Sequence, residues 1–209
     1  MYELNQVYNE DCMSGMSDIP DNYFELAIVD PPYGIGVNHN MGRRKGQPHS
    51  GYKPAGWDSE PPPQAYFDEL RRVSANQIIW GANHFISKVP IDSPCWLMWD
   101  KGFSPDVSFA QFELAWTSFD STAKKFDASP NQPNRIHPTQ KPVDLYKWLL
   151  ANYAKEGDKI LDTHVGSGSS IIACIDMGFD YMGFEIDADY HKAMTDRIYH
   201  FTRQTKLIT

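Results

Sequence analysis

Residues 159–170 read KILDTHVGSGSS, and this stretch decides the predicted fold. Its first residues form a short apolar run, which predicts a buried strand that ends at Asp162. Gly166 and Gly168 predict a tight turn, because glycine adopts backbone conformations that other residues avoid. The apolar segment at 170–177 then predicts a helix. A strand, a glycine turn and a helix in this order begin a βαβ unit.

The same alternation continues on both sides of this stretch. We expect further helices at 63–73, 142–153 and 189–201, and further strands at 26–30, 77–80, 96–99, 112–116 and 181–184. Alternating strands and helices are typical of a mostly parallel sheet with helices on both faces. No segment has the composition of a linker, so the sequence predicts an α/β fold in a single domain over 1–209.

Three of the expected strands end in an acid, namely Asp30, Asp162 and Glu185. Ligands of such sheets bind beyond the carboxyl ends of the strands. Ile171 stands where GxGxxG requires its third glycine, which argues against a nicotinamide oxidoreductase. An acid at Glu185 suits two ribose hydroxyls, and Asp162 suits a cationic group. A nucleoside with a cationic or zwitterionic tail fits this set, and S-adenosylmethionine is such a molecule; a plain turn with a capping serine is the simpler alternative.

The charge of the chain is distributed unevenly. The net charge is −8 and the pI about 5.3, which alone argues against a nucleic-acid partner. Residues 34–57 contain no acid, however, and carry four positive charges, on Arg43, Arg44, Lys45 and Lys53. This pattern fits either a small surface that contacts phosphates or a simple solvated loop.

The cysteines and the N-terminal segment indicate the compartment. Cys12, Cys95 and Cys174 are scattered and form no CxxC, so we expect reduced thiols and no metal site. The chain shows neither a signal peptide nor an apolar run of membrane-spanning length. We therefore expect a cytoplasmic protein.

Several motifs carry a resemblance to a known family. They are NEDCM (9–13), VDPPYGIG (29–36), RIHPTQKPVDL (135–145), LDTHVGSGSS (161–170) and GFEID (183–187). In content and order they resemble the beta-type amino-group DNA methyltransferases, in which the catalytic motif precedes the cofactor motif. The segments at 72–85, 95–102 and 112–118 are similar to small phage- or mobile-element-type members. One departure is Thr163-His164, where the family often has Pro-Phe after the aspartate.

The resemblance implies a Rossmann-like methyltransferase fold and a specific chemistry. A methyl group would pass from S-adenosylmethionine to the N6 amino group of an adenine flipped out of DNA. Asp30 would accept one hydrogen of that amino group and the Pro31 carbonyl the other, while Pro32 helps to hold this carbonyl. Tyr33 would offer a stacking face to the base.

The resemblance also implies a set of cofactor-binding residues. They are Asp11, Cys12, His137, Thr139, Lys141, Asp162, Gly166, Ser167, Gly168, Ser169 and Glu185. Lys141 has the clearest rationale, as the partner of the cofactor carboxylate. The resemblance places His137, with Thr139 and Lys141, in the segment that closes over the cofactor carboxylate. Alternatively, His137 only caps the following helix. Asp187 and Asp189 are expected to begin the last helix, and Trp80, Trp96, Trp99 and Trp116 to lie in the core.

The expected partner is double-stranded DNA, recognised through Arg43, Arg44, Lys45 and Lys53 and through loop insertions at about 34–63 and 118–138. A homodimer would double the basic surface. The sequence leaves open both an orphan enzyme and one that works with a separate restriction endonuclease. Three alternative functions are kept: cytosine-N4 methylation, for which serine is more typical at the Asp30 position; methylation of RNA or a protein glutamine, for which asparagine is more usual there; and an inactive module that binds DNA or cofactor.

Overall fold

A single sheet forms the centre of the protein in the computed structural model, which describes residues 2–36, 56–89, 92–104, 106, 110–132 and 134–205. Within these residues the sheet has eight strands in the order β1-β8-β7-β2-β3-β5-β4-β6. β5 is antiparallel to both of its neighbours, whereas the other adjacent pairs are parallel. The strands are β1 Gln6–Tyr8, β2 Phe24–Val29, β3 Ser74–Trp80, β4 Trp96–Asp100, β5 Phe112–Thr117, β6 Lys124–Asp127, β7 Lys159–Asp162 and β8 Asp180–Phe184.

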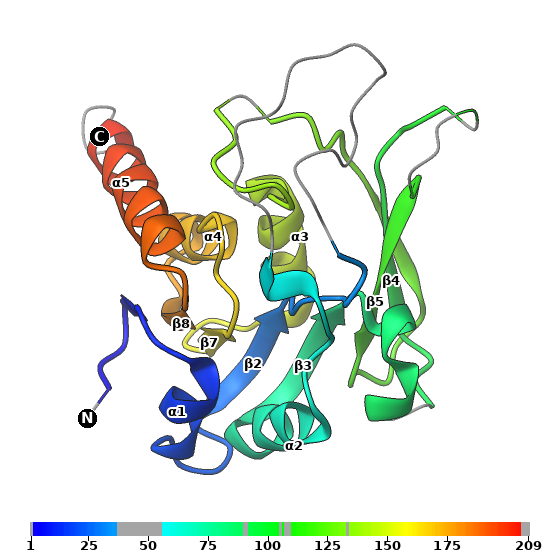
Figure 1. Ribbon diagram of the computed structural model, residues 1–209, viewed down its shortest axis with the longest axis horizontal. Helices are drawn as coiled ribbons and strands as arrows, with labels where there is room; N and C mark the ends of the chain where they lie inside the picture. The colour runs from blue at the N-terminus through cyan, green and yellow to red at the C-terminus, as the bar shows by residue number, and fades with distance from the viewer. Residues whose placement is uncertain are drawn as a thin grey trace.

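Helices cover both faces of this sheet (Figure 1). One apolar cluster joins α1 and α2 to one face, and a second joins α3 and α4 to the other. A third, smaller cluster packs α5 against α4. The helices are α1 Cys12–Ser17, α2 Gln64–Val73, α3 Val143–Tyr153, α4 Ser169–Met177 and α5 Ala188–Thr205, with 3-10 turns at Gly56–Asp58, Ala82–His84 and Ile86–Lys88.

The central strand β2 shows why the apolar runs become strands. Leu26 and Ile28 pack into the cluster on the α3 and α4 side, whereas Ala27 and Val29 pack into the cluster on the α1 and α2 side. Alternate side chains of a strand point to opposite faces. A parallel strand covered on both faces therefore needs a continuous apolar sequence.

The chain leaves β2 and β7 in opposite directions, and this creates a crevice between them. β2 leads through α2 to β3 on one side, whereas β7 leads through α4 to β8 on the other. Asp30 directly follows β2, Asp162 is the last residue of β7, and Glu185 directly follows β8. The three acids thus meet at the carboxyl edge of adjacent parallel strands, at the switch point of a Rossmann-like sheet. The predicted fold class is confirmed.

The structure corrects the predicted elements mainly at the ends of the chain and at the sheet edges. The elements predicted from long apolar patterns are present, with bounds that shift by a few residues. β1 and α1 were not predicted, because three and six residues are too short for a periodic pattern. The segment of β6 was expected to be loop; it is a mostly polar edge strand whose Phe126 packs against Trp148.

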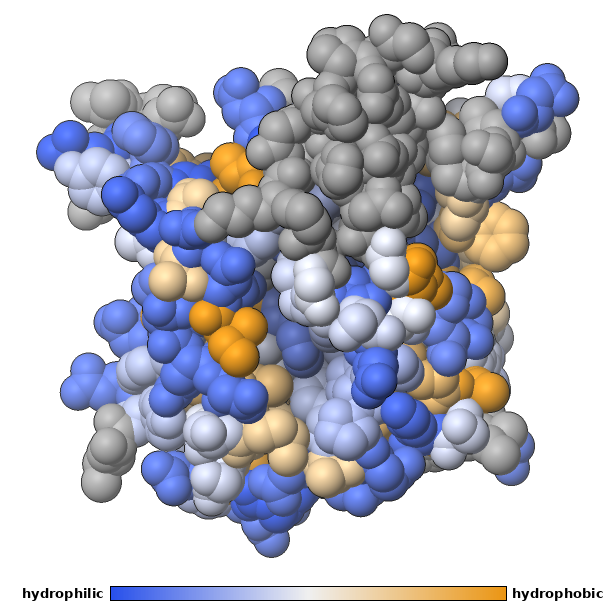
Figure 2. All heavy atoms as spheres, viewed as in Figure 1, coloured by the Kyte–Doolittle hydropathy of each residue, from blue (hydrophilic) through white to orange (hydrophobic). Residues whose placement is uncertain are grey.

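The surface that Figure 2 shows is mostly polar, with apolar side chains in scattered spots. The predicted core tryptophans are buried, except that Trp96 is only partly so. All three cysteines are free. In the part of the chain that the structure describes, no helix combines the length and apolar character needed to cross a membrane.

Candidate active site

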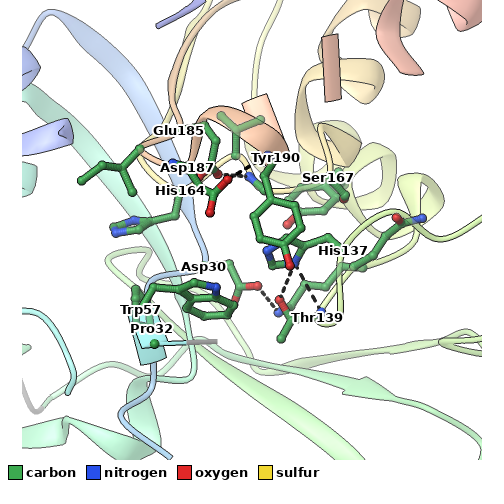
Figure 3. Close-up of a pocket in the computed structure, with 17 residues that line it drawn as sticks. Asp30, Pro32, Trp57, His137, Thr139, His164, Ser167, Glu185, Asp187 and Tyr190 are labelled. Atoms are coloured by element: carbon green, nitrogen blue, oxygen red, sulfur yellow. Dashed lines mark hydrogen bonds and ion pairs between the residues drawn. The ribbon is translucent and has the colours of Figure 1, made fainter. Parts of the chain in front are cut away.

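A cavity of about 600 Å³ opens at the carboxyl ends of β2, β7 and β8. Figure 3 shows Asp30 and Trp57 on one side of it and Glu185 and Asp187 on the other. Eight residues of the predicted site contribute to its lining: Asp30, Pro32, His137, Thr139, Lys141, Gly166, Ser167 and Glu185. The structure therefore brings together the predicted catalytic and cofactor motifs and the HPTQKP segment, which lie far apart in the sequence.

The other predicted residues are not part of the lining of this cavity. They are Asp11, Cys12, Pro31, Tyr33, Asp162, Gly168 and Ser169. Asp11 is exposed and caps α1, where its Oδ1 accepts the Met13 N–H at 2.7 Å. Burial raises the pKa of the neighbouring Cys12 thiol to about 12, so this thiol is neutral at pH 7.

The glycine turn begins α4 and is held by Glu185. Gly168 has φ +77°, and a Cβ there would lie 2.6 Å from Met194 Cγ, so only glycine fits this position. The Gly166 N–H donates to Glu185 Oε2 at 2.8 Å, and the Asp187 N–H donates to Oε1 at 2.9 Å. This carboxylate is fixed at the cavity wall by two main-chain groups. Ser167 and Ser169 are held from behind by Arg197.

Asp162 lies beneath the turn as a buried carboxyl group. Its Oδ2 accepts a hydrogen bond from Ser170 Oγ at 2.5 Å, and its Oδ1 accepts the His164 N–H at 3.0 Å. Burial raises the pKa of Asp162 to about 7, although both hydrogen bonds oppose this shift. Asp162 therefore changes its charge close to neutral pH.

Thr163 and His164, which stand where the family often has Pro-Phe, follow Asp162, and His164 lines the cavity. Thr163 Oγ1 lies 2.6 Å from the Tyr66 hydroxyl and 2.9 Å from His164 Nδ1. The His164 ring packs edge-on against Tyr66, and burial lowers the pKa of His164 to about 4. A neutral imidazole thus lines the cavity where the family often has a phenylalanine.

The turn that carries Asp30 is held by Asp58, which sequence reasoning did not identify. Asp58 is 1% exposed, and its Oδ1 accepts the main-chain N–H groups of Tyr33 at 2.8 Å and Gly34 at 2.9 Å. The Gly36 N–H donates to the Asp58 carbonyl oxygen. Asp58 thereby sets the path of the backbone directly after the two prolines. Nothing in its local sequence distinguishes it from a solvated loop acid.

Asp30 is engaged by two side chains from distant parts of the sequence. The Tyr33 hydroxyl donates to Oδ1 at 2.6 Å, and Lys141 Nζ lies 2.5 Å from Oδ2. Burial raises the pKa of Asp30, with Lys141 opposing the shift. We predicted Lys141 as a partner of a cofactor carboxylate; in the structure its ammonium group is bound by protein carboxylates instead.

Glu113 is the second of these carboxylates, and it too was missed. Its Oε2 lies 2.9 Å from Lys141 Nζ, and its Oε1 lies 2.6 Å from Lys101 Nζ. Burial alone would raise the pKa of Glu113, but Lys141 and Lys101 together lower it to about 2. The signal that could have found Glu113 is an acid inside the otherwise apolar strand at 112–116.

His137 forms part of the opposite wall. Its ring stacks on Trp57 and meets the edge of Tyr190, with ring centroids 5.5 and 4.3 Å apart. Its Nδ1 accepts the Thr139 N–H at 3.3 Å within its own turn. The alternative that His137 caps the following helix is wrong, because Pro142 stands at that position. Asp187 does cap α5, since its Oδ1 accepts the Asp189 and Tyr190 N–H groups.

The basic residues predicted to contact DNA, Arg43, Arg44, Lys45 and Lys53, lie outside the described residues. The region at 118–138, the second predicted recognition element, contains β6 and the turns that lead to His137.

Comparison with known proteins gives consistent matches. The methylase family N6_N4_Mtase, described as DNA methylase, matches residues 73–196. YubD of Escherichia coli strain K12, described as a methylase, is 26% identical over 93% of this chain and 90% of its own length. The M1.HpyAVI–SAM complex has a TM-score of 0.62 at 16% identity and covers 92% of this chain and 98% of its own. The cytosine-N4-specific PvuII DNA methyltransferase has a TM-score of 0.63 at 11% identity, over 98% of this chain and 93% of its own.

The two structural matches, at these low identities, support the fold, and the family match covers more than half of the chain. The protein therefore belongs to the N6/N4 family of DNA methylases.

Proposed function

We propose that this protein transfers a methyl group from S-adenosylmethionine to the N6 amino group of an adenine flipped out of double-stranded DNA. One observation carries the proposal. The Asp30 carboxylate and the glycine turn with Glu185 open into the same cavity, at the switch point of the sheet. A hydrogen-bond acceptor for an amino group thus faces a site suited to a nucleoside.

The residues of the cavity fit S-adenosylmethionine. A volume of about 600 Å³ is within the range of cofactor-sized sites. Glu185, fixed by two main-chain N–H groups, keeps free lone pairs for ribose hydroxyls. Asp162 lies below the turn, where a cationic amino group would favour its ionised form. When bound, the cofactor supplies an electrophilic methyl group on a sulfonium sulfur.

The catalytic turn is suited to hold an exocyclic amino group. The nitrogen of such a group is a weak nucleophile, because its lone pair is delocalised into the ring. Asp30 and the Pro31 carbonyl would each accept one of its hydrogens and draw the nitrogen towards tetrahedral geometry. The lone pair would then point at the methyl group. Orientation of this kind contributes roughly 7–11 kcal/mol to catalysis.

The choice of adenine rests on Asp30. The fold alone does not separate the two bases, since the cytosine-N4-specific PvuII enzyme has a similar structure. The family resemblance favours adenine, because serine is more typical of the cytosine-N4 enzymes at this position.

The test is to incubate the protein with DNA and methyl-labelled S-adenosylmethionine, and then to digest the DNA to nucleosides. We expect label in N6-methyladenine, and its loss with Asp30→Ala while cofactor binding is retained. Label in N4-methylcytosine alone would contradict the base assignment. Label in RNA or protein but not in DNA would contradict the substrate.

A further inference from the structure

Two carboxylates share one buried ammonium group beside the catalytic turn. Lys141 is 3% exposed, and its Nζ lies 2.5 Å from Asp30 Oδ2 and 2.9 Å from Glu113 Oε2. Its third contact is the Tyr33 hydroxyl, at 3.2 Å. An ammonium group has three N–H bonds, so Lys141 is fully engaged. Any change in the charge of Asp30 therefore alters how far the positive charge of Lys141 is compensated.

The outer end of the cluster is formed by Lys101, which binds the other oxygen of Glu113 at 2.6 Å. When all four groups are ionised, two positive and two negative charges alternate from Lys101 through Glu113 and Lys141 to Asp30. The side chain of Lys101 is 14% exposed, against 2% for Lys141. A surplus charge on the cluster is thus best tolerated at Lys101, where water reaches it.

The proposed reaction, on which this inference rests, makes such a surplus. As the nitrogen–carbon bond forms and the carbon–sulfur bond breaks, sulfur keeps the electron pair. The methylated nitrogen becomes cationic and loses one proton, which Asp30 is placed to accept. A protonated Asp30 no longer compensates the charge of Lys141. A buried ammonium group without a counter-ion is strongly unfavourable.

We propose that Glu113 is a positioning residue for methyl transfer: it keeps the Lys141 charge paired while Asp30 accepts the amino hydrogen and then the proton. Glu113 also limits how tightly Lys141 binds Asp30, so that Asp30 stays available as an acceptor. The different surroundings of Asp30 and Glu113 shift the pKa values of the two carboxyl groups apart. Burial raises the pKa of Asp30, whereas the two lysines lower that of Glu113. The permanent anion is thus distinct from the group that accepts a proton.

Other charged and titratable groups also surround Asp30. Tyr33 and Lys141 contact it directly, and both also contact Glu113, with the Tyr33 hydroxyl 3.2 Å from Glu113 Oε2. More distant groups that interact with its charge are Asp162 from β7, Tyr66 from α2 and Tyr146 from α3. A saturating cofactor concentration at every pH removes the contribution of Asp162 to the pH dependence of the methyl-transfer rate. The remaining acid limb of the rate profile then reports Asp30.

The experiment compares single-turnover methyl transfer between pH 5 and 9 for the wild type and Glu113→Gln. Loss of the Glu113 charge leaves Asp30 as the remaining carboxylate on Lys141 and lowers the pKa of Asp30. We expect the acid limb to move to lower pH by about one unit, the size typical of a nearby charge, and the plateau rate to fall. Lys101→Gln should move the limb in the opposite direction, since it strengthens the pairing of Glu113 with Lys141.

Asp127→Asn is the matched control. Asp127 also pairs with a lysine, at 2.7 Å, but its side chain is 65% exposed. Its removal should leave the acid limb unchanged. An active wild type whose limb stays in place in Glu113→Gln, or moves to higher pH, overturns the role of Glu113. If Glu113→Gln does not fold, an unmoved limb in Lys101→Gln overturns it. A wild type that binds cofactor but transfers no methyl group contradicts the proposed function itself.

Discussion

Oδ1 of Asp58 accepts the main-chain N–H of Tyr33 at 2.8 Å, across a separation of 25 residues. The turn that follows Asp30, which we propose to be catalytic, is therefore held by a residue outside its own motif. The same oxygen accepts the Gly34 N–H, so one carboxylate satisfies two successive, partly buried donors. Rigid prolines restrict the turn, but Asp58 determines where it points.

Replacement of Asp58 by alanine should misplace the turn and leave both donors unpaired. An unpaired donor costs about 1–3 kcal/mol of stability when buried and less in a partly buried turn such as this one, and a displacement of about 1 Å can cost about 10²-fold in rate. We expect a large loss of kcat with cofactor affinity retained, measured by labelled methyl transfer and calorimetry. Asp58→Asn keeps one acceptor oxygen and should lose less. The exposed neighbour Glu60 is the control; equal losses in Asp58→Ala and Glu60→Ala would contradict this role.

Tyr33 should contribute to methyl transfer in two separable ways, through its hydroxyl group and through its ring. Its hydroxyl bonds to Asp30, and its ring already stacks on His84, with centroids 5.1 Å apart and planes inclined by 15°. Tyr33→Phe keeps the ring and should reduce kcat only moderately. Tyr33→Ala should also lose base stacking, which is worth about 1–3 kcal/mol. Steady-state kinetics on DNA test this order, with Tyr199→Ala on α5 as a surface control. Equal effects of Tyr33→Phe and Tyr33→Ala would exclude a stacking role.

Cofactor binding should weaken as the pH falls below about 7, the raised pKa of Asp162. In the free protein this carboxyl group is protonated below that pH, and a cation bound above the glycine turn would favour its ionised form. The Kd should therefore rise by about tenfold per pH unit well below pH 7, for one coupled proton. His137 and His164 have pKa values lowered to about 4 and stay neutral over most of this range. Calorimetry from pH 5 to 8 tests the slope, and Asp162→Asn should bind weakly with little pH dependence. A flat Kd in the wild type would show that Asp162 does not face the cation.

The basic segment should act on DNA affinity and leave the choice of base unaffected. If Arg43, Arg44 and Lys45 each contact one phosphate, their joint replacement by glutamine should reduce the log–log salt slope by about 3. The methylated base should stay the same, because phosphate contacts carry no direct sequence information. Binding titrations at several salt concentrations measure the slope. An unchanged slope would remove this segment from the DNA interface.

The parts of the molecule that the sequence predicts well are those with a local physical cause. β2, α2, α3 and α4 follow from apolar periodicity, because each buries a continuous or periodic face. The meeting of Asp30, Asp162 and Glu185 follows from their place at the ends of parallel strands. These three acids therefore lie together at the switch point of the sheet.

The contacts that sequence reasoning missed all depend on long-range packing. Lys141 meets Asp30 across 111 residues, and it also meets Glu113, which lies on β5, a strand that pairs with β3 in an antiparallel register. No local pattern encodes that register. Asp58 resembles any loop acid until its two N–H donors are in view. Short edge strands such as β6 lack an apolar face and so give no periodic signal.

The central claim is that Asp30 holds an adenine amino group for methylation, and methylation-aware sequencing of DNA from cells that express the protein tests it most directly. We predict N6-methyladenine in a defined short sequence context, absent from cells that express equal amounts of Asp30→Ala. N4-methylcytosine in place of N6-methyladenine, or the same N6-methyladenine with both proteins, would contradict the claim.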